Sequence, residues 1–347
     1  MNKHIIVIGC GIVGLTTAIL LVEKGYKVTI AAKWLPGDRH IEYTSPFAGA
    51  HWRAMASNDD FLLQSFETIS YKKFLQLGRQ LPNDTGVMVV PSYDYYNTLK
   101  DVENPWFKDI VEDFSFISPS EFPNQDIKVG HKYTTVLINS PYYLNWLLKQ
   151  FTMKGGKIQR KELKDIHEAF DDYVDAVVNC TGLGSLSLGG VKDTKLFPTR
   201  GQTILVRGNH IKKTITCLDD RGITYIIPRN DGTIILGGTS QKNDFNPKVD
   251  KDIAESILKR TQEICPELFN NGPLTILRHS VGLRPTRVGG VRIENQKYEK
   301  INGQPIIVTH AYGHGGFGYQ SSYGSSEYIC TCVEKGFHQL QKENAKL

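Results

Sequence analysis

The sequence predicts a two-domain protein of the α/β class (α+β as a whole), with one parallel sheet flanked by helices and one mostly antiparallel sheet. Its 347 residues are enough for two domains with a sizeable core. A short apolar strand, three spaced glycines and an apolar helix stand near the N-terminus, as in a unit of parallel sheet. Runs with strand character, Thr203–Val206, Thr224–Ile227 and Thr233–Leu236, predict the second sheet.

The composition is that of an ordinary globular protein. Hydrophobic residues make up 40% of the chain and charged residues 22%, with a formal net charge of +5. The surplus of 41 basic over 36 acidic residues is small and spread out, which excludes the clustered basic stripe of a nucleic-acid partner. The six cysteines form no C-x-x-C pair and lack the histidine neighbours of a zinc site, so we expect reduced thiols and no metal.

The segment from Ile5 to Val22 is almost continuously apolar, so a membrane span or a signal peptide must be considered first. Its three glycines and the Thr16-Thr17 pair argue against both. We interpret it as a buried strand, Ile5–Ile8, and a helix, Ile12–Lys24, and we expect no insertion into a membrane.

The glycines between these two elements predict a dinucleotide site. Gly9, Gly11 and Gly14 have the spacing G-x-G-x-x-G, which allows a tight turn, a close approach of the pyrophosphate and close packing of helix on strand. A strand precedes them, a helix follows, and a second strand, Lys27–Ala31, comes next. The start of the helix at Ile12 and Val13 should offer free N–H groups to the phosphates. We therefore expect a Rossmann-like domain.

The end of the second strand does not decide which dinucleotide binds, NADP or FAD. The acidic residue that usually binds the ribose hydroxyls is missing, and Ala31, Ala32 and Lys33 stand there instead. Lys33 would suit the 2′-phosphate of NADP or lie along the adenosine of FAD.

Three later segments favour FAD. The loop Tyr43–Trp52 is rich in small and hydroxyl residues, and Asp175–Gly184 is a strand that ends in a glycine turn. In His310–Gln320 we expect the glycines to open a helix that runs through Ser325 to Lys335. A second glycine-rich helix start suits a flavin, whose two ends need separate backbone cradles. Besides the first motif and Lys33, the expected FAD contacts are Thr44, Ser45, Gly49, Ala50, His51, Trp52, Thr181, Gly182, Gly313, Gly315, Gly316, Phe317, Gly318, Tyr319 and Gln320.

Nearly the whole chain resembles the FAD-dependent D-amino acid oxidase family, which includes the D-aspartate oxidases, and it resembles the yeast and fungal members in particular. The resemblance lies in Val7–Gly14, Ser45–Ala50, Val177–Gly184, Pro198–Gln202, Tyr225–Pro228, Leu236–Gly238, Val281–Pro285 and Tyr312–Gly315. It implies noncovalently held FAD, oxidation of a D-amino acid by hydride transfer to the flavin, and reoxidation by oxygen. The products would be a 2-oxo acid, ammonia and hydrogen peroxide.

Arg284 is the candidate partner of the substrate α-carboxylate. A bidentate arginine is the strongest geometric match to a carboxylate, and Arg284 directly follows an expected strand, Leu277–Leu283, which would place its side chain rigidly. The family motif Gly-Leu-Arg-Pro supports this role, whereas Arg287 lacks the motif and is expected to be structural. By the resemblance, the Tyr225 hydroxyl also reaches the carboxylate.

The resemblance gives the α-amino group two acceptors, the carboxamide oxygen of Gln320 and a backbone carbonyl near Gly316. No matched position supplies a base, as hydride transfer requires none. We expect His51, His310 and His314 to be loop residues that hydrogen-bond to backbone or cofactor.

The side chain of the substrate is the open question. A dicarboxylic substrate needs a second cation in the pocket. By the resemblance, two arginines supply it in mammalian D-aspartate oxidases, and the matching positions of this chain hold Leu218 and Ser240. This difference favours neutral D-amino acids. Arg53 and Arg221 keep a D-aspartate oxidase open as the alternative. An NADP-dependent dehydrogenase is a remote alternative that would leave the last glycine cluster without a role.

We expect a discontinuous FAD-binding domain, residues 1–50, 142–200 and 280–347, and a substrate-binding domain, residues 51–141 and 201–279. The resemblance leaves a homodimer open.

The final tripeptide, Ala345-Lys346-Leu347, resembles the Ser-Lys-Leu signal of the peroxisomal import receptor. We expect the residues before it, Gln341–Asn344, to fray beyond the last helix and expose it, and we expect the protein in the peroxisome.

Overall fold

A computed structural model describes residues 3–99, 101–270 and 272–344 of the chain. The chain forms two compact units that alternate along the sequence. The first consists of Met1–Pro46, Leu144–Thr199 and Leu283–Leu347, and the second of Phe47–Tyr143 and Arg200–Gly282. The predicted domains alternate in the same order, with boundaries at 50, 142, 200 and 280.

The first unit is built on a six-stranded sheet in the order β14-β15-β7-β1-β2-β6. The pairs β1–β2, β1–β7, β7–β15 and β2–β6 are parallel, whereas β14 and β15 form an antiparallel hairpin. This is the Rossmann-like sheet that the sequence predicts. Its strands are β1 (His4–Ile8), β2 (Lys27–Ala32), β6 (Lys157–Arg160), β7 (Ala176–Asn179), β14 (Arg292–Glu299) and β15 (Pro305–Tyr312).

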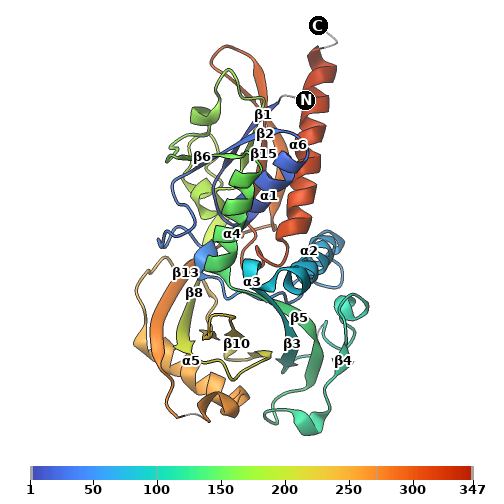
Figure 1. The fold of residues 1–347 in the computed structure, drawn as a ribbon, viewed down its shortest axis with the longest axis vertical. Coiled ribbons are helices and arrows are strands. Elements are labelled where there is room, and N and C mark those ends of the chain that lie inside the picture. The colour runs from blue at the N-terminus through green and yellow to red at the C-terminus, as the bar shows by residue number, and fades with distance from the viewer. Residues whose placement is uncertain (1–2, 100, 271, 345–347) are drawn as a thin grey trace. The chain divides into compact units, whose positions relative to one another are not determined.

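The long helices of this unit are α1 (Ile12–Glu23), α4 (Ser140–Met153), which starts in the second unit, and α6 (Ser322–Asn344). Helix α1 packs beside α6 (Figure 1), and the Thr17 hydroxyl donates to the Ser326 Oγ at 2.9 Å. The predicted strand and helix at the N-terminus are present as β1 and α1.

Two expectations about α6 are wrong. The glycines at 313–318 do not open it, because they lie in turns and the helix begins only at Ser322. Residues 341–344 are its last turn, not a frayed tail, because their backbone hydrogen bonds continue the helix. The tripeptide Ala345–Leu347 lies outside the described residues.

Three turns leave the carboxyl edge of this sheet together. In the strand register Ile8 pairs with Asn179, and Asn179 pairs with His310. The chain therefore turns at Gly9, at Cys180 and at Gly313 just beyond the ends of adjacent strands. Ligands of open parallel sheets bind at this edge.

The second unit is built on a nine-stranded sheet in the order β12-β8-β11-β10-β9-β3-β5-β4, with β13 also paired to β8. The pairs around β10, the β8–β11 pair and the pairs around β5 are antiparallel, and β3–β9 is parallel. The strands are β3 (Val87–Tyr96), β4 (Ser115–Phe116), β5 (Val129–Ile138), β8 (Leu196–Arg207), β9 (Thr214–Asp219), β10 (Gly222–Pro228), β11 (Thr233–Gly237), β12 (Gln241–Lys242) and β13 (Ile276–Arg287).

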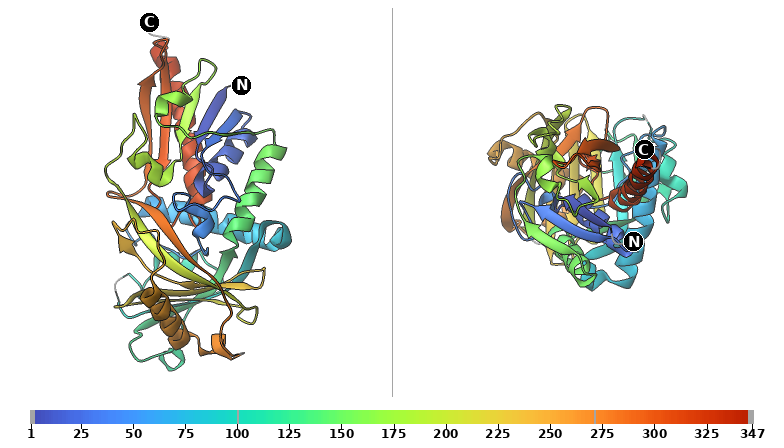
Figure 2. Two further views of the ribbon diagram at one scale, coloured as in Figure 1. Left: turned by 90° about the vertical axis from the view of Figure 1, so that its left-hand side faces the viewer. Right: turned by 90° about the horizontal axis from the view of Figure 1, so that it is seen from above.

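Side chains of β10 alternate between the two faces of this sheet, as the period of a strand requires. Ile226 packs in the cluster that includes Ile257 of α5 (Lys251–Ile264), and Figure 2 shows α5 along that face. Tyr225 and Ile227 pack in a separate cluster with Ile235. The other helices of this unit are α2 (Phe61–Gln80) and α3 (Pro82–Thr85).

Within the described residues, no helix combines the length and the apolar character that a membrane span needs.

Candidate active site

The first glycine turn has no room for side chains. A Cβ on Gly9, which has φ +105°, would lie 2.5 Å from the Cys180 carbonyl oxygen, and one on Gly14 would overlap the carbonyl of Gly9. A Cβ on Gly11 would lie 2.8 Å from the Ser45 Oγ. The backbone is therefore bare where a pyrophosphate would approach it.

Side chains from the following loop close this turn. The Ile12 N–H donates to the Ser45 Oγ at 3.1 Å, so this N–H, expected to be free, already has a partner. The Tyr43 hydroxyl donates to the Cys10 carbonyl at 2.6 Å, and the Thr44 hydroxyl donates to the Leu283 carbonyl at 2.5 Å. The predicted contacts Thr44 and Ser45 thus lie beside the motif.

The second turn is fixed by the end of β7. The Asn179 Oδ1 accepts hydrogen bonds from the Thr181 N–H at 3.2 Å and from the Thr181 hydroxyl at 2.8 Å. Gly182 follows with φ +57°, and a Cβ on it would be 3.7 Å from the Pro285 Cγ. The turn therefore lies against the segment that carries Arg284.

The third turn lies along the same segment. The Gly315 N–H donates to the Pro285 carbonyl at 2.9 Å, and Thr286 forms a bridge with His314. A Cβ on Gly316 would lie 3.3 Å from the Arg284 Cδ. The structure thus brings together two of the predicted substrate residues, Arg284 and Gly316.

The end of the third turn reaches the first. The Tyr319 hydroxyl donates to the Ser45 carbonyl at 3.0 Å, and a Cβ on Gly318 would be 3.7 Å from the Ile12 Cγ2. Gln320, the predicted acceptor for the substrate amine, is 5% exposed and stands just before α6. The glycine segments that the sequence singles out in this unit therefore converge.

Two of the three histidines carry buried ring nitrogens that have no hydrogen-bond partner among the described residues, His51 Nε2 and His314 Nε2. Burial lowers the pKa of His314 to about 4, and burial together with Arg53 lowers that of His51 to about 3. The unpaired His314 Nε2, which lies in the third turn of the first unit, fits a polar cofactor there, because buried nitrogens normally have partners. His310 differs from the expectation, since it lies in β15 and not in a loop.

In the second unit, Tyr225 is held by glycines. A Cβ on Gly238 would lie 2.5 Å from the Tyr225 hydroxyl oxygen, and one on Gly237 would overlap the ring. Only glycine leaves room for the ring over this end of β11. This tyrosine is 8% exposed.

The loop 47–52 is anchored in the second unit by contacts that the sequence did not suggest. Arg229 donates from Nε to the Gly49 carbonyl at 2.8 Å and from Nη2 to the Ala48 carbonyl at 3.0 Å. A Cβ on Gly49 would be 2.5 Å from the Ile227 Cδ1. Trp52 is fully buried, and its indole N–H donates to the Glu67 carbonyl at 2.9 Å, which makes it a core residue of this unit.

Lys33 is engaged by carboxylates. Its Nζ lies 2.9 Å from the Glu42 Oε2 and 3.0 Å from the Glu162 Oε1, at the end of β2. Hydrogen bonds to these two glutamates raise its pKa. Two carboxylates beside the lysine disfavour a 2′-phosphate there, so the geometry gives no support to NADP.

The two arginines that kept a dicarboxylic substrate open also have partners. Arg221 is exposed, donates to Asp219 at 2.7 Å and to Glu263 at 2.6 Å, and belongs to the surface. Arg53 is 6% exposed; burial works against its charge, but Tyr96, Asp94 and Tyr133 raise its pKa. Leu218 is half-buried and Ser240 is exposed.

Residues 4–331 match the family described as FAD dependent oxidoreductase. The chain belongs to this family. The D-amino-acid oxidase of Schizosaccharomyces pombe is 37% identical over 332 residues, and the match covers 93% of each chain. The D-aspartate oxidase of Cryptococcus neoformans var. grubii is 30% identical, with 94% of this chain and 95% of the relative covered.

Solved structures of this family share the fold. The glycine oxidase of Bacillus cereus superposes with a TM-score of 0.73 at 22% identity, covering 96% of this chain and 95% of the other. The chain is an FAD-dependent oxidoreductase. Its bare glycine turns and the unpaired His314 nitrogen fit FAD, which Gly9–Gly14, Thr44–Ser45, Thr181–Gly182 and Gly313–Gln320 would hold.

Proposed function

We propose that this chain is a D-amino acid oxidase that acts on neutral D-amino acids. It would convert a D-amino acid, oxygen and water into a 2-oxo acid, ammonia and hydrogen peroxide. The observation that carries the proposal is the close packing of Arg284 on the glycine turn at Gly316. A Cβ on that glycine would lie 3.3 Å from the Arg284 Cδ. A carboxylate-binding arginine beside a dinucleotide turn suits an α-amino acid as substrate.

Each residue has one task in this proposal. Arg284 binds the α-carboxylate through its planar fork of N–H groups, and the Tyr225 hydroxyl donates to the same group. The Gln320 carboxamide oxygen and the Gly316 carbonyl accept from the neutral amine and orient the Cα–H bond. When bound, FAD supplies the redox chemistry, the uptake of two electrons and their transfer to oxygen.

The preference for neutral side chains rests on charge. A buried side-chain carboxylate without a partner costs several kcal/mol, on the order of 3–5. Arg221 is paired with two carboxylates at the surface, and Arg53 interacts with Asp94 and Tyr96 inside the second unit. Neither guanidinium is left over for a substrate carboxylate, which supports D-alanine or D-methionine over D-aspartate. The D-aspartate oxidase among the relatives keeps the acidic substrate as the alternative.

A panel of D-amino acids tests the proposal. The purified protein should be yellow with bound FAD, and it should form peroxide with D-alanine and D-methionine at a higher kcat/KM than with D-aspartate. L-alanine serves as the control for stereochemistry. A kcat/KM for D-aspartate well above the value for D-alanine would favour the alternative.

We also propose import into the peroxisome through Ala345-Lys346-Leu347. Two points support this proposal: the tripeptide is similar to Ser-Lys-Leu, with one small residue in place of another, and a peroxide-forming oxidase benefits from enzymes that destroy peroxide. A fluorescent protein fused to the N-terminus should mark peroxisomes in cells, and deletion of residues 345–347 should leave it diffuse. Puncta that persist after the deletion would refute this role.

A further inference from the structure

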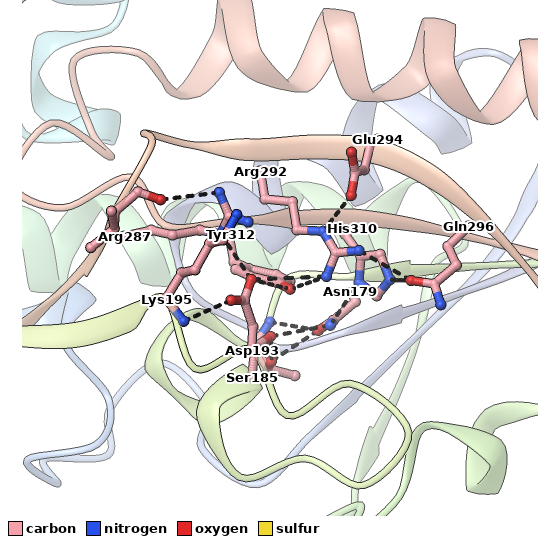
Figure 3. Close-up of polar contacts among 12 residues, drawn as sticks. Asn179, Ser185, Asp193, Lys195, Arg287, Arg292, Glu294, Gln296, His310 and Tyr312 are labelled. Carbon is pink, nitrogen blue, oxygen red and sulfur yellow. Dashed lines mark hydrogen bonds and ion pairs between the residues drawn. The ribbon is translucent and has the colours of Figure 1, made fainter.

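A buried carboxylate in the first unit has no role in the proposed chemistry. Asp193 is 9% exposed and stands between the turn after β7 and the start of β8. Its Oδ2 accepts from the Arg287 Nε at 2.8 Å and from the Tyr312 hydroxyl at 3.0 Å, and its Oδ1 accepts from the Lys195 N–H at 3.0 Å (Figure 3). The carboxylate thus ties together the end of β13, the end of β15 and the start of β8.

The charges around Asp193 favour its ionised form. Burial by itself would raise the pKa of this carboxyl, but the hydrogen bonds from Arg287, the Lys195 N–H and Tyr312 outweigh it and lower the pKa. Arg292 adds a second cation, which donates to the Tyr312 hydroxyl at 2.6 Å and lies 3.9 Å from the Asp193 Oδ2. A charged acceptor with several donors makes strong and directional hydrogen bonds.

The aliphatic part of Arg287 covers the third glycine turn. A Cβ on Gly313, which has φ +89°, would lie 2.9 Å from the Arg287 Cβ and 3.2 Å from its Cδ. The Arg287 side chain therefore packs directly on the turn. Arg287 also ends the strand that carries Arg284, and the residues between them bond to the same turn.

We propose that Asp193 is a positioning residue for this active site. It holds Arg287 on Gly313 and thereby fixes the Gly313–Gly316 turn and the adjacent Arg284. The inference rests on the proposed function, because the turn is assigned to FAD and Arg284 to the substrate. It also gives Arg287 a specific task, whereas the sequence left that arginine as a general structural residue.

A purely structural role would have a different signature. If Asp193 only stabilised the fold, its loss would lower the melting temperature, but the folded protein would bind FAD and substrate as before. A positioning role changes the affinity for FAD and the KM in protein that is still folded, because a small displacement of binding groups weakens binding.

The experiment compares Asp193→Asn with the parent and with Glu294→Gln. Asparagine keeps the shape but removes the charge that Arg287 and Tyr312 share, whereas Glu294 is an exposed carboxylate that bonds to the Arg292 side chain at 2.6 Å. We expect Asp193→Asn to raise the Kd of the apoprotein for FAD about tenfold, measured by quenching of flavin fluorescence, and to raise the KM for D-alanine at saturating FAD. Glu294→Gln should leave both values within about twofold of the parent.

Two further variants keep the test decisive. Tyr312→Phe removes one donor and leaves the Arg287–Asp193 bond, so it provides a milder version if Asp193→Asn does not fold. The double variant Asp193→Asn with Arg287→Gln should bind FAD no more weakly than Asp193→Asn alone, because the two residues act as one unit.

The outcomes separate this inference from the proposed function. A parent protein that neither binds FAD nor oxidises D-alanine would contradict the proposed function. A parent that does both, with an FAD Kd and a KM that are unchanged in Asp193→Asn and Tyr312→Phe while the melting temperature falls, would overturn the positioning role. Additive losses in the double variant would also overturn it, because they would mean that Asp193 does not act through Arg287.

Discussion

In the proposed role of Arg284, a single side chain must meet two demands, a fixed position and a charge that matches a carboxylate. The strand β13 and the contact with Gly316 meet the first demand. A guanidinium meets the second, because its planar fork of N–H donors matches the two oxygens of a carboxylate. The same two demands explain why a lysine, a flexible point charge, would serve less well.

We expect Arg284→Ala to retain FAD but to lower kcat/KM for D-alanine about a hundredfold or more. The reason is the loss of a charge-assisted pair with the carboxylate, which contributes about 3 kcal/mol. FAD content by absorbance and steady-state peroxide formation measure the two effects. Arg284→Lys is the matched control and should recover part of the activity, because the charge returns without the bidentate geometry. Parent-like kcat/KM in Arg284→Ala would contradict the assignment of the carboxylate.

For Arg221, in contrast to Arg284, we expect a substitution to have no effect on catalysis or substrate preference. Its guanidinium bonds to Asp219 and Glu263 at the surface, so its removal should leave the active site untouched. We expect Arg221→Gln to change the ratio of kcat/KM for D-aspartate and D-alanine by less than about twofold, since exposed ion pairs contribute about 0–1 kcal/mol. A selective loss of D-aspartate turnover in this variant would place Arg221 in substrate recognition.

At the scale of elements, the turn between β1 and α1 depends on the absence of side chains. Gly11 has φ −80°, which any residue tolerates, so only space decides what fits there. A Cβ would meet the Ser45 Oγ at 2.8 Å, and larger side chains would also cover the backbone that faces the pyrophosphate.

Gly11→Val should therefore fold with little or no bound FAD, which flavin absorbance per protein and circular dichroism would measure. Gly184→Ala is a control from the neighbouring turn, because its Cβ would lie at an ordinary 3.4 Å from the Thr181 Cβ. It should keep its FAD. Full flavin content in Gly11→Val would mean that the pyrophosphate of FAD does not bind at this turn.

The elements that local pattern specifies were predicted well. The strand β1, the helix α1 and the glycine spacing between them form one contiguous segment, so period and motif are enough to recognise them. The start of α6 was predicted too early, because Gly313 and Gly315 have positive φ and serve turns that bond to Pro285, far away in sequence.

Residues that act across long sequence distances were missed for the same reason. Arg229 donates to carbonyls 180 and 181 residues earlier, and Asp193 binds an arginine 94 residues later. Nothing near either residue in sequence signals such a partner. Arg260 is a third example, since it reaches from α5 to the carbonyls of Ile223 and Gly238. A buried charge becomes visible only when the fold is known.

At the scale of the whole molecule, histidines couple folding to pH, because burial lowers the pKa of His51, His131, His310 and His314. Burial lowers the pKa of His310 to about 3, and the neutral ring accepts from the Asn179 amide at Nδ1 and donates to Gln296 at Nε2. The pKa values of His51 and His314 are lowered in the same direction, to about 3 and about 4. In an unfolded chain an imidazole has a pKa of about 6.5.

The sign of the effect follows from these values. Because the unfolded chain binds protons at a higher pH than the folded one, the histidine contribution to stability is complete above about pH 6.5 and is lost as the pH falls toward 4. At about pH 5 the lowered pKa of each of His51, His310 and His314 decreases the free energy of unfolding by about 2 kcal/mol. Asp94 offsets part of this loss of stability at low pH. Burial raises the pKa of its carboxyl, so the folded state binds this proton at a higher pH than the unfolded chain does.

We therefore expect urea unfolding of the apoprotein to show a free energy several kcal/mol lower at about pH 5 than at about pH 7.5. His310→Gln can keep a hydrogen bond to its neighbours but cannot titrate, so it should reduce this pH-dependent loss by about 2 kcal/mol. His40→Gln, at a side chain 43% exposed, is the control for the effect of the substitution itself. A pH-dependent loss of equal size in the parent and in His310→Gln would show that the acid sensitivity arises from other groups.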